Sequence, residues 1–203
     1  MKAGMKKCIS YLLTAVFVIS AVLSAGGLQK KQVRAAEKFQ IHFIDVGAAD
    51  GALLQYGEGS SAEYALIDTG ADYYTTTKGE QIPTKDWAYN YLIEKGIKKL
   101  KFILLTHPHR DHIGGLERIL REDDIEVEKI YGNNRNLTYS GADGNNKEFD
   151  KEFYKETLAA IDSYADRNGK GENFYEVPVM GSTINIGNAR VQFYGPADES
   201  AGP

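Results

Sequence analysis

Three of the four histidines in this 203-residue chain lie in one short segment, His107-Pro108-His109-Arg110-Asp111-His112. From the residue frequencies of the chain, an H-x-H-x-D-H pattern would arise by chance with a probability of roughly 10⁻⁴, so it indicates a site rather than a solvated loop. Imidazole and carboxylate groups suit Zn²⁺, and Mn²⁺ or Fe²⁺ accept the same donors. We therefore predict a metal site with His107, His109, Asp111 and His112 as ligands.

The spacing of these ligands predicts two divalent metal ions, with zinc as the best match. His107 and His109 are two residues apart and can point the same way, whereas Asp111 and His112 can serve a second ion. Two ions about 3.5 to 4 Å apart activate water and hold both oxygens of an in-line displacement. The predicted chemistry is hydrolysis, with Asp111 also as the candidate catalytic residue.

The position of the motif explains how the fold can present it. It begins where the apolar run 100–106 ends and finishes where helical periodicity begins, and α/β proteins build sites in such loops. Another predicted strand ends at Asp68, which we expect to orient a ligand histidine, although a carboxylate that caps a turn would fit equally. The fourth histidine, His42, is predicted to pack in the sheet.

The remaining pattern predicts one mixed α/β (α+β) domain. Short apolar runs punctuated by glycine predict strands, and apolar spacing of three and four predicts helices. Strands are expected over 39–47, 51–56, 64–68, 100–106 and 125–131, helices over 83–95, 113–120 and 154–165, a loop over 133–146, and a hairpin over 183–194.

The first 36 residues differ from the rest in charge. They hold six of the 24 Lys and Arg and none of the 28 Asp and Glu, which leaves 18 − 28 = −10 for residues 37–203. Lysines, an apolar run over 8–25 and small residues near Ala35 follow the order of a secretory signal, with an uncleaved N-terminal anchor as the alternative. We expect a secreted or cell-surface protein whose domain spans 37–203, with no other membrane contact.

Two features of the composition narrow the function. The single cysteine, Cys8, lies in the leader, so the domain can form no disulfide and offers no thiolate ligand. An acidic domain argues against stable nucleic-acid binding, which needs clustered Lys and Arg.

At the histidine motif the chain resembles the metallo-β-lactamase-fold hydrolases. Four segments carry the resemblance: IHFIDVGAAD (41–50), ALIDTG (65–70), FILLTHPHRDHIGG (102–115) and VPVMGSTINIGNARVQFYGP (177–196). They are most similar to the branch that contains ComEC-type competence proteins and secreted teichoic-acid phosphorylcholine esterases. The resemblance implies an αββα sandwich in which H-x-H-x-D-H supplies ligands to both metals.

Two departures from that family pattern matter. Ala48 and Ala49 stand where the family segment DVGQGD has Gln and Gly. The family also has a further histidine, a bridging aspartate and a final histidine beyond the matched region. We therefore expect the N-terminal half of the sandwich, with an incomplete metal site and a sheet edge prone to association.

The resemblance implies a secreted, metal-dependent hydrolase of phosphodiesters, small or polymeric, in the intact protein. It offers nucleic acid and choline-phosphate cell-wall polymer as substrates, and the acidity of the domain favours the smaller one. Tyr73, Tyr74 and Trp87 could contact a choline group, although packing is their commoner role. The alternatives are a non-catalytic surface-binding module or pseudoenzyme, and β-lactam hydrolysis, which only the name of the fold suggests.

Overall fold

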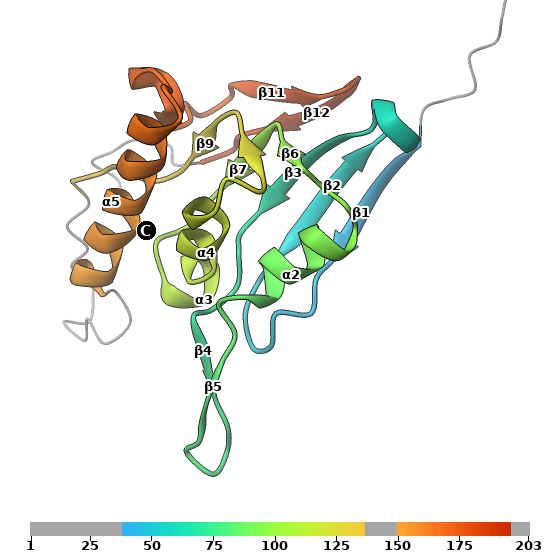
Figure 1. Ribbon diagram of the computed structural model, residues 1–203. Coiled ribbons are helices and arrows are strands. Elements are labelled where there is room, and N and C mark those ends of the chain that lie inside the picture. Colours follow the sequence, from blue (N-terminus) through green and yellow to red (C-terminus); the bar gives the residue numbers. More distant parts are fainter. Residues whose placement is uncertain (1–37, 137–149, 196–203) are drawn as a thin grey trace, which may run out of the picture. The chain divides into compact units, whose positions relative to one another are not determined.

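The computed structural model describes residues 38–136 and 150–195, all within a single unit over 37–203. Its centre is a six-stranded sheet in the order β1-β2-β3-β7-β9-β10 (Figure 1). Neighbours are antiparallel from β1 to β3 and parallel from β3 to β10. The strands are β1 (Phe39–Phe43), β2 (Ala52–Tyr56), β3 (Glu63–Ile67), β7 (Phe102–Leu104), β9 (Ile130–Tyr131) and β10 (Tyr175–Glu176).

Three two-stranded pairs and several helices complete the described fold. The pairs are β4 (Tyr73–Thr75) with β5 (Gln81–Pro83), β6 (Lys99–Leu100) with β8 (Glu126–Val127), and β11 (Thr183–Ile186) with β12 (Ala189–Gln192). The helices are α2 (Trp87–Glu94), α3 (Arg110–Ile113), α4 (Leu116–Arg121) and α5 (Lys151–Arg167), with short 3₁₀ turns η1 (Gly59–Ser61) and η2 (Glu172–Phe174). No helix in the described ranges combines the length and apolarity that crossing a bilayer requires.

One face of the sheet is covered by helices. Residues paired across neighbouring strands share a face, and one such row runs His42, Leu53, Leu66, Ile103, Ile130 and Tyr175. The middle four are fully buried and join side chains of α2, α4 and α5 in one core cluster. Burial of each such aliphatic side chain stabilises the fold by about 1.5 to 3 kcal/mol.

The other face, which we call the open face, is covered by much less. Leu54, Ala65 and Phe102 pack there against Ile186 of the β11–β12 hairpin. Towards the β1 edge the apolar side chains of Phe39, Ile41 and Phe43 are exposed, Phe43 to 87%. The described part of the chain therefore has one well-covered sheet face and one partly bare apolar face.

The mixed α/β class and most of the predicted elements are confirmed, and the differences have local causes. The β4–β5 hairpin was not predicted because each of its strands has only three residues, too few to show a period. Pro83 ends β5 instead of opening a helix, and α2 begins at Trp87. The predicted strand over 125–131 is split, because β8 pairs with β6 outside the main sheet whereas β9 joins β7 within it. The predicted loop over 133–146 lies mostly outside the described residues.

Candidate metal centre

The histidine motif spans the turn after β7 and the start of α3. His109 is extended, with φ −87° and ψ 152°, and its carbonyl accepts the backbone N–H groups of His112 and Ile113 at 3.0 Å each. Asp111 and His112 therefore lie on the first turn of a short helix. The sequence predicted a loop through His112, and the structure corrects this, because His109 already acts as the N-cap residue of α3.

The two glycines that follow the motif bring it close to the segment after β3. A Cβ at Gly114 would overlap the backbone of Ala71 and Asp72, and one at Gly115 would overlap the carbonyl of Thr69. Only glycine allows so close an approach. Thr69 in turn donates its backbone N–H and its hydroxyl to the His112 carbonyl, at 2.7 and 3.1 Å. The end of β3 thus fixes the helix that carries two predicted ligands.

Asp68 connects the ends of β3 and β7 beneath the motif. Its side chain is nearly inaccessible, with 3% exposure for the residue, and it accepts the backbone N–H of Thr106 at 2.8 Å and the hydroxyl of Thr106 at 2.7 Å. It lies 2.8 Å from Nδ1 of His112. Asp68 has a φ of 55°, a strained value for a residue other than glycine, and such strain concentrates at functional sites.

These contacts determine which nitrogen of each ring is free. An ionised carboxylate only accepts hydrogen bonds, so a neutral His112 ring carries its proton on Nδ1 and has its lone pair on Nε2. The hydroxyl of Thr106 donates to Asp68, so its oxygen can accept from Nδ1 of His107, 3.2 Å away. Asp68 thus orients His112 directly and His107 through Thr106, and both Nε2 atoms can bind a cation.

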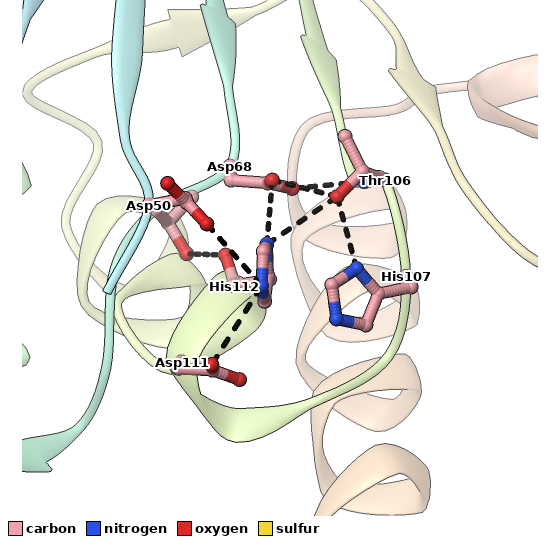
Figure 2. Close-up of polar contacts among 7 residues, drawn as sticks. Asp50, Asp68, Thr106, His107, Asp111 and His112 are labelled. Atoms are coloured by element: carbon pink, nitrogen blue, oxygen red, sulfur yellow. Dashed lines mark hydrogen bonds and ion pairs between the residues drawn. The ribbon is translucent and has the colours of Figure 1, made fainter. Parts of the chain in front are cut away.

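Three of the four predicted ligands come together (Figure 2). His107, Asp111 and His112 each offer one ligand atom, and these atoms lie within 4.8 Å of one another. The rings of His107 and His112 are 3.6 Å apart between centroids. His109 does not belong to this group, although its ring centroid is 4.7 Å from that of His107. Two imidazoles and a carboxylate with free lone pairs form a donor set that fits a divalent metal ion.

The electrostatics keep His107 in the form that can bind a metal. Burial lowers the pKa of His107, and the neighbouring rings of His112 and His109 lower it further, against the opposite influence of Asp68 and Asp111. A lower pKa favours the neutral imidazole, which is the form that ligates metals. The neutral His107 ring keeps a lone pair on one nitrogen, which a cation can bind without first displacing a proton.

Arg110, whose role the motif alone did not suggest, fastens α3 to the start of α5. Its guanidinium lies 2.5 Å from Asp72 and 2.8 Å from Asp150, and 4.0 Å above the ring of Phe153. The carboxylate of Asp150 also accepts the backbone N–H of Phe153 and so caps α5. The same carboxylate therefore starts the long helix and holds the metal-binding segment.

His42 and Trp87 lie in packing positions, whereas Tyr73 and Asp50 do not. His42 contacts the Tyr91 hydroxyl through Nδ1 at 2.7 Å, edge-on to its ring, on the face covered by α2. Trp87 packs partly buried against the helix-side core, whereas Tyr73 is exposed on β4. Asp50, which sequence reasoning quoted only as part of a matching segment, lies next to His112, with 3.5 Å between Oδ2 and Nε2.

Comparison with known proteins assigns the chain to a family. The model of the metallo-beta-lactamase superfamily matches residues 53–183, which is more than half of the chain. This chain belongs to the metallo-β-lactamase superfamily. A search of curated proteins found no match.

Several solved structures are similar to the chain at low sequence identity. A subclass B3 metallo-β-lactamase from a soil metagenome library, MEM-A1, has 14% identity and a TM-score of 0.44, over 77% of this chain and 49% of that one. BJP-1, a subclass B3 metallo-β-lactamase of Bradyrhizobium japonicum, has 19% identity and a TM-score of 0.39, over 77% of this chain and 52% of that one. A diphosphatase of the PhnP family has 19% identity and a TM-score of 0.36, over 70% of this chain and 41% of that one. The chain spans about half the length of these proteins.

Proposed function

We propose that the intact protein is a secreted, metal-dependent hydrolase of phosphodiesters. The observation that supports hydrolysis is the convergence of His107, Asp111 and His112, with both histidine Nε2 atoms left free by Asp68 and Thr106. A divalent ion bound there, for which zinc suits the donors best, would supply the Lewis acidity that activates water and polarises a phosphoryl oxygen.

The residues of this chain would hold and orient the reacting groups. Asp68 fixes the orientation of the His112 ring, and the Thr106 hydroxyl contacts Nδ1 of His107 and so orients that ring. Asp111, which is half exposed, can accept a proton or a hydrogen bond from a water at the mouth of the site. In the predicted arrangement of two metal ions, His109 would serve the ion that His107 faces.

The choice of phosphodiesters rests on the ComEC-like and phosphorylcholine-esterase-like segments, in particular 41–50 and 102–115. Between a nucleic acid and a choline-phosphate cell-wall polymer, the net charge of −10 over 37–203 favours the latter, because choline groups carry positive charge whereas a nucleic acid is a polyanion without such compensation. Export is proposed from the basic and apolar order of residues 1–36, which fits an extracellular polymer as substrate.

Turnover by the zinc-loaded full-length protein tests this proposal. We expect cleavage of bis-nitrophenyl phosphate or nitrophenyl-phosphorylcholine, no cleavage of a chromogenic cephalosporin, and loss of at least 100-fold in kcat/KM for His112→Ala. Asp162→Asn, which changes a half-exposed carboxylate of α5 paired with Arg135, is the control and should leave turnover unchanged. If the fully metallated protein cleaves neither ester, the hydrolase proposal fails and the non-catalytic binding module replaces it.

A further inference from the structure

Asp50 and Asp111 flank the same nitrogen of His112. Oδ2 of Asp50 lies 3.5 Å from Nε2 of His112, and Oδ2 of Asp111 lies 3.7 Å from it (Figure 2). The two carboxylates come from different segments, Asp50 from the turn before β2 and Asp111 from α3. A hydrogen bond links their main chains: the backbone N–H of Asp50 donates to the Asp111 carbonyl at 3.2 Å.

In the neutral form of His112, which is the form that ligates a metal, all three facing atoms carry lone pairs. The contact of Nδ1 with Asp68 places the proton of the neutral His112 ring on that nitrogen, so Nε2 cannot donate. Both separations are also longer than an ordinary hydrogen bond. Two carboxylate oxygens and an imidazole lone pair repel one another unless a positive charge lies among them.

We propose that Asp50 belongs to the cation site, where its carboxylate, the carboxylate of Asp111 and Nε2 of His112 together hold a divalent metal ion. Asp50 lies outside both the H-x-H-x-D-H motif and the group of three side chains whose ligand atoms lie within 4.8 Å of one another. With His107 of the group described for the candidate metal centre, the donors are two neutral imidazoles and two carboxylates, whose charge of −2 balances one divalent ion. The inference deepens the proposed function, because it concerns the metal on which that function rests.

The backbone holds Asp50 in place although its side chain is 74% exposed. Its carbonyl accepts the N–H of Gly70 at 2.9 Å, and the next residue, Gly51, accepts the N–H of Ile44 at the same distance. A Cβ at Gly70 would overlap the side chain of Val46, so that contact needs glycine. A fixed backbone with an accessible carboxylate is suited to receiving an ion from solvent.

Asp50→Asn tests the proposal against a matched control in the same turn. Asp45 has the same charge, but its carboxylate accepts the backbone N–H of Gly47 instead of facing His112. Zinc affinity of the metal-free 203-residue chain would be measured by competition with a chromogenic chelator. We expect at least tenfold weaker binding for Asp50→Asn and less than a twofold change for Asp45→Asn. Equal affinity of Asp50→Asn and the wild type would overturn the proposal, as would a wild type that binds no zinc.

Thermal unfolding of the metal-free proteins at pH 8 gives a second readout. If the three facing atoms repel one another, Asp50→Asn keeps the wild-type Tm or raises it. A lower Tm would show that the Asp50 carboxylate stabilises the metal-free fold, and the proposal would then be wrong. Phosphodiester turnover separates the two proposals: zinc binding that depends on Asp50 without turnover refutes only the proposed function, whereas turnover with Asp50-independent zinc binding refutes only this inference.

Discussion

The two faces of the central sheet differ in how completely they are covered. On the helix side, a row of side chains from Leu53 to Ile130 is fully buried beneath α2, α4 and α5. On the open face, the β11–β12 hairpin shields the middle strands, and Phe43 at the β1 edge remains 87% exposed. The same six strands thus have a dense core on one side and a thin cover on the other.

This difference shows which part of the fold positions the candidate metal centre. The motif follows β7, α3 leads into α4, and Arg110 ties α3 to α5, so all of these connections run to the helix side. The apolar cluster on the open face contains none of the described metal-facing residues. We infer that the geometry of the site depends on the helix-side core and little on the open face.

The largest expected effect comes from a cavity in the helix-side core. Leu66→Ala removes a fully buried side chain, and we expect a loss of about 3 kcal/mol in the free energy of unfolding, measured with urea. Phe43→Ala on the open face is the matched change and should alter it by less than about 0.5 kcal/mol. Equal losses for the two variants would show that the open face is covered in solution.

A smaller effect is expected where the motif touches the segment after β3. Gly114→Ala forces a Cβ into the backbone of Asp72, and we expect a loss of about 2 kcal/mol in stability together with weaker zinc binding. Gly171→Ala is the control, because a Cβ at Gly171 would point into open space and the φ of Gly171, −78°, suits any residue. An unchanged zinc affinity in a folded Gly114→Ala protein would mean that the close approach does not position the ligands.

The next expected effect concerns the orientation of the ligand rings. Asp68→Asn keeps the shape but removes the charged acceptor of His112 and Thr106, so we expect zinc affinity to fall by about 10- to 100-fold. The measurement is the chelator competition described above, with Asp162→Asn as the surface control. Affinity within twofold of the wild type would contradict the role of Asp68.

The smallest expected effect concerns the cover of the open face. A side-chain hydrogen bond from Lys101 lowers the pKa of Glu63, and a backbone hydrogen bond from Gly187 lowers it further. Gly187 belongs to the hairpin turn, so ionised Glu63 fastens the hairpin to β3. Because the folded pKa lies below the usual 4.5, this stabilisation is present above that value and is lost as pH falls below it.

Thermal unfolding between pH 6 and pH 3.5 tests this dependence. Glu63→Gln should reduce the loss of Tm on acidification, because the variant no longer has the ionised carboxylate to lose. Glu58→Gln, which removes a carboxylate paired with Lys38 at the surface, should follow the wild type. Identical acid dependence in Glu63→Gln and the wild type would show that Glu63 does not fasten the hairpin.

The features that could be predicted from the sequence are those that depend on local patterns of residues. Strand and helix periods predicted the helix-covered sheet, and the ends of two predicted strands located Asp68 and the motif. The contacts that orient the site were beyond prediction, because Thr106, Arg110 and Asp50 act through partners that only the fold brings near. The separation of His109 from the ligand group also depends on where α3 begins, which a spacing argument does not specify.

We propose that His107 and His112 converge with a carboxylate on one cation. X-ray absorption at the zinc edge of the zinc-loaded chain tests this convergence. We expect a shell of nitrogen and oxygen donors with scattering from at least two imidazoles, and loss of one imidazole in His112→Ala. Zinc bound without imidazole scattering, or a spectrum unchanged by His112→Ala, would contradict it.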